Sequence, residues 1–313
     1  MSIDQQHTVD ILQAQAFLTR HLGTEPSDIV RLGEGAWSQC FGFMCDGQDL
    51  VIRFGKYVSD FQKDQLAYRY ANAALPIPEV IEIGAAPDGY YAISTRVYGV
   101  PLESVPAEQW LALVPAIVSA LEAMRLADLS GSEGFGGWDA DGHAAHGSWR
   151  TRLLEVAEDT PDQRGHGWRE RLATSAVGTA TFEWGLDLLR RVADDTVPRC
   201  LVHGDLMNRN VFVDADRITG VFDWGCSIYG DHLYDLALIE FWSPWYPALD
   251  MEALRTALEQ RWAERSYSPQ NKVSRLEACY LHIGLEHLAY HAHLGNWQTL
   301  LEIAQRMRAL IPE

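Results

Sequence analysis

This sequence is poor in cysteine and has no long apolar run. The five cysteines are scattered along the chain and no two form a Cys-x-x-Cys pair, so the pattern predicts neither a disulfide framework nor a zinc site. We interpret them as reduced packing residues. The opening MSIDQQHTVD is polar and lacks the apolar core of a signal peptide. No later run approaches the roughly 20 apolar residues that span a bilayer, so we expect a cytoplasmic protein.

Positive charge is also scarce. The chain has 25 Lys and Arg against 43 Asp and Glu, for a formal net charge of -18 and a pI near 4.9. Such a surface repels phosphate backbones and anionic lipids, which argues against a nucleic-acid or membrane partner. A cationic small molecule would instead be attracted. A length of 313 residues suits a soluble monomer of two lobes with a sizeable core.

One stretch, LVHGDLMNRNVFVDADRITGVFDW at 201–224, concentrates polar groups that suit chemistry. Short apolar runs at 201–202, 211–213 and 221–222 predict strands, and the Asp-rich segment 214–217 predicts a turn. In the resulting hairpin Val213 would face Ile218 and Asn210 would face Val221. Asp223 would then lie diagonally across from Asn210, roughly 7 to 8 Å away.

Asn210 and Asp223 offer an amide oxygen and a carboxylate, which are ligands that Mg²⁺ accepts beside phosphate oxygens and waters. Asp205, in the loop before the hairpin, is left for proton transfer. The alternative is a surface hairpin with ordinary Asp and Asn turn residues, and for any single residue that reading is simpler. The three together, with His203-Gly204 before Asp205, favour a catalytic site.

The first hundred residues predict a helix at 8–21 followed by an antiparallel meander with strands near 29–32, 40–44 and 50–54. The turn at 33–38 carries Gly33, Gly35 and Ser38, and such a turn can bring backbone N–H groups close to phosphates. Most glycines in hairpins have no such role. The position of this turn at the start of the meander favours a nucleotide contact.

Two cations follow on the third strand, on opposite faces. Alternation puts Arg53 and Lys56 on different sides, so only one can face a nucleotide, and we favour Arg53 because Lys56 suits a solvated loop. A helix predicted at 59–74 carries Asp64, which could pair with the strand cation or lie on the surface. Strands at 81–83 and 90–97 then lead to a Gly/Pro exit at 98–101 that has the composition of a hinge.

The periodicity after residue 106 is mainly helical, with helices predicted at 107–128, 149–158, 182–193 and 274–294. The glycine-rich segment 131–147 follows a helix rather than a strand, so we reject it as a phosphate loop.

A further helix, 230–240, is predicted to start near Asp231 and carries Asp235 and Glu240. It runs into an aromatic cluster with Trp242, Trp245 and Tyr246. Aromatic faces stack on sugar rings and attract ammonium groups. We therefore expect these carboxylates and rings to bind a cationic substrate, although aromatic clusters are most often core.

The order of these motifs resembles the aminoglycoside phosphotransferase family over nearly the whole chain. The resemblance rests on the glycine hairpin, Arg53, Asp64, the hinge, the 203–210 loop, Asp223-Trp224 and Gly230-Asp231. Shorter stretches resemble the hygromycin B phosphotransferases in particular, namely ALPIPEV at 74–80, GFG at 134–136, FWSPW at 241–245 and IGL at 283–285.

The resemblance implies an α+β, bilobal, protein-kinase-like fold with a nucleotide-binding lobe at 1–97, a hinge at about 94–101 and a mainly helical lobe at 98–313. ATP or GTP would lie between the lobes, near Ser94 and Val97. Asp205 would accept or orient the proton of the acceptor hydroxyl, and Asn210 with Asp223 would hold Mg²⁺. His203 and Asp231 would brace the catalytic loop.

The function implied is transfer of a γ-phosphate to a hydroxyl of an aminoglycoside, hygromycin B being favoured, with antibiotic resistance as the outcome. Alternatives are a kinase of a choline, homoserine or sugar-amine hydroxyl, a macrolide kinase, and a nucleotide-binding pseudokinase. The pseudokinase is disfavoured because Asp205, Asn210 and Asp223 are all present. Arg53 and Asp64 depart from the lysine and glutamate common in the family.

Overall fold

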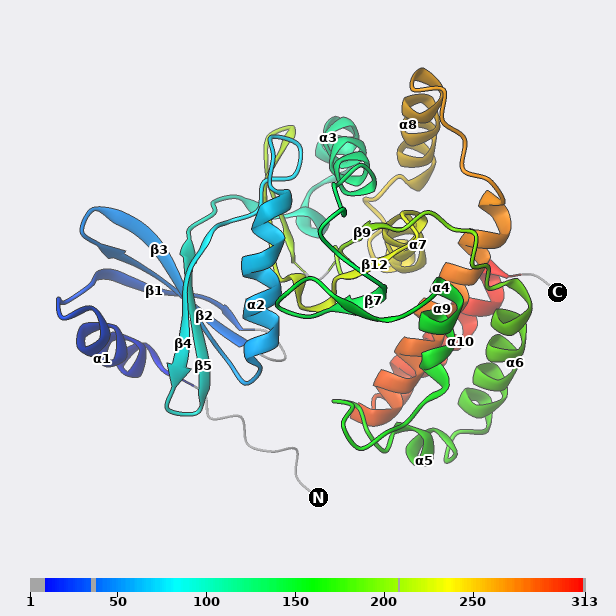
Figure 1. Ribbon diagram of the computed structural model, residues 1–313, viewed down its shortest axis with the longest axis horizontal. Helices are drawn as coiled ribbons and strands as arrows, with labels where there is room; N and C mark the ends of the chain where they lie inside the picture. Colours follow the sequence, from blue (N-terminus) through cyan, green and yellow to red (C-terminus); the bar gives the residue numbers. More distant parts are fainter. Residues whose placement is uncertain (1–8, 35–37, 208, 312–313) are drawn as a thin grey trace.

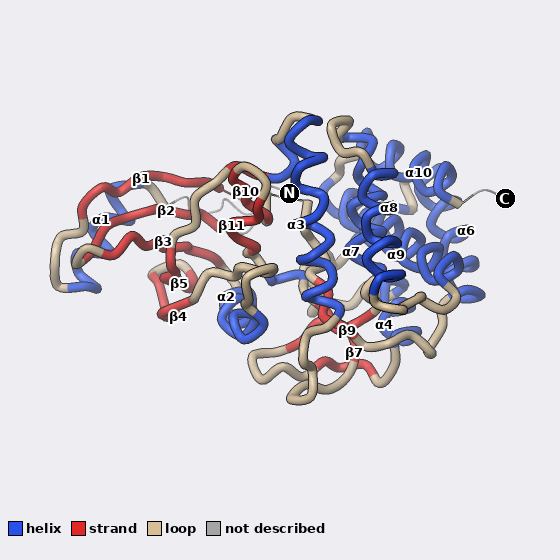
Figure 2. The backbone as a smooth tube through the Cα atoms, turned by 90° about the horizontal axis from the view of Figure 1, so that it is seen from above, coloured by secondary structure: helices blue, strands red, loops and turns tan. Residues whose placement is uncertain are grey.

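The computed structural model describes residues 9–34, 38–207 and 209–311. Figure 1 shows a sheet-rich first region on one side, a helical second region on the other, and helix α2 (Val58–Ala67) between them. Figure 2, seen from above, shows the same separation of strands and helices. The expected α+β class, with a sheet in the first region and mainly helices in the second, is confirmed. Within the described ranges, no helix is long and apolar enough to cross a membrane.

The first region is a five-stranded antiparallel sheet with the order β1-β2-β3-β5-β4, which confirms the predicted meander. Its strands are β1 (Ser27–Glu34), β2 (Ser38–Cys45), β3 (Gln48–Gly55), β4 (Val80–Ala86) and β5 (Gly89–Thr95). Side chains alternate along β2 and β3, so Phe41, Phe43 and Ile52 are fully buried on one face. Helix α1 (Ile11–Leu22) contributes Ala14 and Leu18 to the same core cluster.

Helix α2 ends earlier than the predicted residue 74. It stops at Ala67 and continues only as a 3-10 turn, Tyr68–Tyr70. Beyond this turn the Asn72 side-chain oxygen accepts hydrogen bonds from the N–H groups of Ala74 and Leu75 at 2.9 and 3.2 Å, so the chain does not resume the helix before residue 74. Local side-chain bonds of this kind compete with the helical pattern.

The second region holds eight of the described helices and two small sheets. Its helices are α3 (Ala107–Arg125), α4 (Trp149–Leu154), α5 (Trp168–Leu172), α6 (Ala176–Val192), α7 (Leu233–Trp242), α8 (Met251–Glu264), α9 (Lys272–Leu294) and α10 (Trp297–Leu310). Its strands are β6 (Val100–Pro101), β7 (Phe135–Trp138), β8 (Ala144–His146), β9 (Cys200–Val202), β10 (Val211–Asp214), β11 (Arg217–Val221) and β12 (Ile228–Gly230). The sheets have the orders β11-β10-β6 and β8-β7-β12-β9, so the glycine-rich segment 131–147 contributes the paired strands β7 and β8.

Strands β10 and β11 form the predicted hairpin, but half of its predicted register is wrong. Val213 does face Ile218, whereas Val221 faces Val211 instead of Asn210. The register shifts between Val213 and Phe212, and Thr219 is left without a partner residue, as in a β-bulge. The extra residue advances β11 by one position before it reaches the site.

Helix α7 is the centre of the second region. Every residue from Leu233 to Phe241 is buried, and the helix packs against α9, which also packs against α5, α6 and α10. A helix that is apolar on all sides is buried on all sides. Its polar residues therefore lie in the protein interior, where they need fixed partners.

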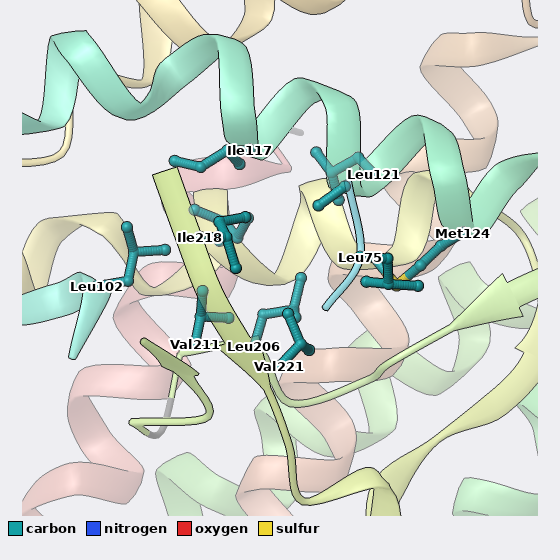
Figure 3. Close-up of a pocket in the computed structure, with 11 residues that line it drawn as sticks. Leu75, Leu102, Ile117, Leu121, Met124, Leu206, Val211, Ile218 and Val221 are labelled. Carbon is teal, nitrogen blue, oxygen red and sulfur yellow. The ribbon is translucent and has the colours of Figure 1, made fainter. Parts of the chain in front are cut away.

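A small apolar cavity of about 20 Å³ lies under the loop that precedes β10. Figure 3 shows residues from several elements facing it, including Leu102, Ile117 and Leu121. Leu206 and Val211 also line it, and they are the direct neighbours of Asp205 and Asn210. The loop that carries the candidate catalytic groups therefore packs against apolar side chains.

Candidate active site

The loop after β9 is held from below by a carboxylate of α7. Asp235 accepts hydrogen bonds from the backbone N–H groups of His203 and Gly204, both at 2.8 Å. Gly204 has φ 78°, and a Cβ there would lie 2.7 Å from the carbonyl oxygen of Cys226. The loop thus needs glycine at 204 to pass this close to the turn that follows β11.

His203 braces the loop from a fully buried position. Its Nδ1 accepts the N–H of Asp205 at 3.2 Å, so Nε2 carries the proton and donates it to the carbonyl of Phe222 at 3.1 Å. Burial lowers the pKa of His203 to about 4, which keeps the ring neutral. His203 connects the loop to the hairpin as a positioning residue.

Asp205 and Asn210 are brought together by this loop. The Asn210 amide Nδ2 donates to the backbone oxygen of Asp205 at 2.7 Å and to its Oδ2 at 3.1 Å. Because the nitrogen is used in this way, the amide oxygen is the atom of Asn210 that can serve a cation. The backbone N–H of Phe222 donates to the Asn210 carbonyl at 3.0 Å, which places Asp223 beside Asn210.

Asp223 has a left-handed backbone, with φ 64° and ψ 62°. This conformation is unfavourable for a residue with a Cβ and persists where the surroundings impose it, often at functional sites. The side chain remains 47% exposed, and its Oδ1 lies 3.7 Å from Nη1 of Arg53. The oxygens of Asn210 and Asp223 therefore form a donor set that fits a hard cation such as Mg²⁺.

Arg53 and Asp64 form the ion pair between β3 and α2 that was expected from the sequence. Both side chains are largely buried, at 15% and 9% exposed. Asp64 also accepts the backbone N–H of Trp224 at 2.7 Å, so the pair is tied to the residue after Asp223. Lys56 is exposed, in agreement with its interpretation as a solvated charge.

The remaining nucleotide-site residues are placed only in part. Gly33 pairs with Cys40 and Ser38 pairs with Gly55 at the end of the meander, whereas Gly35 lies outside the described residues. Ser94 pairs with Val51 in the sheet, and Val97 packs against Gly220 of β11. Their contact with a nucleotide stays a prediction, as does the lobe boundary at 94–101.

Asp235 and Glu240 do not lie where a substrate could reach them. Each is only 2% exposed. Asp235 holds the loop as described above, and Glu240 binds Arg255 and Tyr280. The expectation that they contact substrate is wrong, because α7 is buried on all sides.

Asp231 does not touch the catalytic loop directly. It forms a buried ion pair with Arg275 of α9, with Nε and Oδ2 2.7 Å apart, and accepts the N–H of Leu233 at the start of α7. The bracing role predicted for Asp231 therefore belongs to Asp235, one helical turn further along.

The predicted aromatic cluster is partly exposed, as a ligand surface requires. Trp242 lies 5.0 Å from Trp245 and 4.7 Å from the ring of His287, measured between ring centroids. Burial raises the pKa of the Tyr246 phenol, and the nearby charges of Glu103 and Asp205 raise it too, with Arg209 opposing them. Tyr246 therefore lies near the catalytic loop.

One carboxylate that sequence reasoning missed is Glu286 on α9. Its side chain is 41% exposed and forms an ion pair with Arg152 at 3.0 Å. The pKa of the Cys226 thiol is raised to about 12, first by burial and further by the charges of Asp205 and Glu286 among others, so both carboxylates lie near this turn. Helical spacing alone gives no signal for such a residue, since most acids on helices are simply solvated.

A search of solved structures connects this geometry to a class of protein. The chain superposes on the ternary complex of a thermostable mutant of aminoglycoside phosphotransferase APH(4)-Ia with AMP-PNP and hygromycin B. The TM-score is 0.80 and the identity 33%, with coverage of 95% of this chain and 97% of that one. Spectinomycin phosphotransferase APH(9)-Ia, at 12% identity and TM-score 0.59, covers 98% of this chain and 96% of its own and shares the fold. The fold is that of the kinase-like phosphotransferases.

Sequence comparison places the chain more narrowly. Residues 52–269 match the model of the phosphotransferase enzyme family. The chain is also 34% identical over 288 residues to the hygromycin-B 4-O-kinase of Escherichia coli, covering 91% of this chain and 81% of the relative. This protein belongs to the phosphotransferase enzyme family, as its motifs indicated.

Buried neutral histidine makes the protein sensitive to acid. The pKa of His203 is about 4 in the folded state against 6.5 in the unfolded chain, so the unfolded chain binds its proton first as the pH falls. The free energy of unfolding should therefore decrease between pH 6.5 and pH 4, by about 1.4 kcal/mol per pH unit for each such histidine, and should gain nothing above pH 7. Urea denaturation across this range measures the slope. In His203→Gln one proton fewer is bound on unfolding, so the decrease of the unfolding free energy per pH unit should be smaller by that contribution. An unchanged slope would contradict the low pKa of His203.

Proposed function

We propose that this protein transfers the γ-phosphate of ATP or GTP to a hydroxyl of an aminoglycoside antibiotic, with hygromycin B as the favoured acceptor. The observation that carries the proposal is the joint placement of Asp205, Asn210 and Asp223 in a fold shared with a chain that holds both a nucleotide analogue and hygromycin B. The 34% identity to a hygromycin-B kinase supports it. Phosphorylation would add negative charge to a cationic drug and remove a hydroxyl contact, and so confer resistance.

Phosphoryl transfer depends on positioning and charge neutralisation more than on covalent chemistry. In this chain Asp205 accepts or orients the proton of the acceptor hydroxyl, and its place is set by Asn210, His203 and Asp235. Asn210 and Asp223 would hold Mg²⁺, which would neutralise phosphate charge when bound. Arg53 supplies the cation on the strand side and is itself oriented by Asp64.

The acceptor would lie against the exposed faces of the aromatic cluster and beside Glu286 on α9. Trp242, Trp245 and Tyr246 offer faces for sugar rings and ammonium groups. Glu286 takes the role that the sequence assigned to Asp235 and Glu240, because its side chain is 41% exposed and lies near the same turn as Asp205, whereas theirs are buried. Burial acts to raise the pKa of Glu286, but His282 and Arg152 together outweigh it and hold the pKa at about 2, so the carboxylate is ionised whenever the enzyme works.

A nucleotide-consumption assay tests the proposed function directly. The purified protein should consume ATP or GTP rapidly with hygromycin B, more slowly or not at all with other aminoglycosides, and not with a macrolide or choline. Mass spectrometry should show one added phosphate on the antibiotic. Efficient turnover of choline, homoserine or a sugar amine, with none of hygromycin B, would replace the proposal by the metabolite-kinase alternative.

Substitution of the catalytic carboxylate separates binding from chemistry. In Asp205→Asn the kcat should fall by at least about 10²-fold, because the group that takes the proton is lost. The nucleotide affinity should stay within about 3-fold, since Asp205 does not bind phosphate. Asp214→Asn, an exposed change on the same hairpin, is the matched control. Near-normal turnover by Asp205→Asn would refute the base assignment.

Loss of the carboxylate proposed to bind the acceptor should change the KM for the antibiotic. Glu286→Gln removes one attraction for an ammonium group, so KM should rise about 10-fold while the KM for nucleotide is unchanged. In the wild type this KM should also rise with added salt, because screening weakens the same attraction. The salt dependence should be weaker in the variant. Glu252→Gln, at an exposed site in the first turn of α8, changes the charge by the same amount and is the control. Equal KM values for the wild type and the two variants would exclude Glu286 as a contact of the antibiotic.

A further inference from the structure

Helix α2 is bonded to the turn that follows Asp223 through two adjacent side chains. The Lys63 ammonium donates to the carbonyl oxygens of Gly225 and Ser227 at 2.9 and 3.2 Å. Asp64 accepts the backbone N–H of Trp224 at 2.7 Å. Together the two side chains hold three of the four residues of the turn at 224–227, which begins directly after the proposed magnesium ligand.

The environment of Lys63 is unusual for a lysine. Its ammonium lies 5.6 Å from the ring centroid of Trp138, over the ring face, and within the described ranges it forms no ion pair with a carboxylate. Burial, the largest cause, lowers the pKa of Lys63 to about 8. Removing a charge from water costs free energy unless strong hydrogen bonds compensate, and here two backbone carbonyls provide them. The positive charge of Lys63 therefore serves to hold the two carbonyl groups of the turn in place.

The turn needs such support because Asp223 is in the left-handed region, at φ 64°. Its strained backbone persists only while the chain on either side is held. On one side the hairpin bond from Phe222 to Asn210 holds it. On the other side the Trp224 N–H donates to Asp64, and the carbonyl oxygens of Gly225 and Ser227 accept hydrogen bonds from Lys63, both side chains being on α2.

We propose that Lys63 is a positioning residue for the metal site, which fixes Asp223 in its ligand conformation by holding the carbonyls of Gly225 and Ser227. The inference rests on the proposed function in taking Asp223 as a magnesium ligand. Lys63 touches neither nucleotide nor acceptor. It acts only through the backbone of the turn.

The attachment of α2 does not depend on Lys63 alone, so a variant at this position should fold. Asp60, one turn earlier, forms an ion pair with Arg164 at 2.7 Å. Beyond the helix, the hydroxyl of Tyr70 lies 3.1 Å from that of Tyr229. Loss of Lys63 would therefore loosen the turn locally and leave the helix in place.

The test measures magnesium-linked binding of ADP by calorimetry, without acceptor. In Lys63→Met the gain in ADP affinity caused by Mg²⁺ should shrink by about 10-fold or more, which is the usual effect of removing a group that orients a metal ligand. ADP affinity without Mg²⁺ and the melting temperature should stay close to wild type. Lys63→Arg keeps two donors and should recover most of the linkage. Lys56→Met, at the exposed lysine, is the matched control.

Two results would overturn the inference. One is a wild-type magnesium linkage in Lys63→Met, and the other is an equal loss of ADP affinity with and without the metal, which would indicate general damage. The measurement needs no antibiotic, so a protein that ignores hygromycin B but shows the expected losses would contradict the proposed acceptor and still support Lys63. A wild type whose ADP affinity does not depend on Mg²⁺ would overturn both the metal assignment and the inference.

Discussion

The two hydrogen bonds from the backbone of His203 and Gly204 to the carboxylate of Asp235 are the interaction on which the catalytic loop depends. Burial raises the pKa of Asp235 to about 6, against the effect of those two donors, which favour the charged form. The charge is tolerated because both oxygens meet N–H groups at 2.8 Å. The loop is thereby anchored to α7, the most buried helix of the second region.

From this anchor the site extends outward through backbone contacts. His203 is hydrogen-bonded to the hairpin at the carbonyl of Phe222, and Asn210 orients Asp205. The turn after Asp223 is bonded to α2 through Asp64. Asp64 joins the end of this series to Arg53 in the sheet. The residues proposed to meet nucleotide and acceptor are thus held by elements from both regions.

Much of this arrangement could be predicted from local patterns. The meander, the hairpin and the group formed by Asp205, Asn210 and Asp223 follow from short-range alternation and turn composition, and the Arg53–Asp64 pair follows from one strand and the next helix. The errors have longer-range causes. The bulge at Thr219 shifts the strand register. Counting residues outward from the turn assumes a regular register and cannot show the shift.

The substrate carboxylates were misplaced for another reason. Periodicity identifies α7 as a helix but cannot show that neighbouring helices cover it completely, and so Asp235 and Glu240 were taken as accessible. Glu286 and Lys63 give no local signal, because their importance comes from segments that are distant in the sequence. Tertiary burial decides which acids of a helix face solvent and which serve the backbone.

The shortest strand has a mechanical consequence. Val100 and Pro101 of β6, directly after the first region ends, pair with Val213 and Phe212 of β10, the strand that starts next to Asn210. At Gly99, with φ 148°, a Cβ would come within 2.6 Å of the Val213 carbonyl, so the connection lies tightly against the hairpin. The segment that links the sheet to the helical region is therefore bonded to the hairpin and is not a flexible linker. A rotation of the sheet that preserved this two-residue ladder would therefore also move the hairpin, and with it the residue next to β10, Asn210.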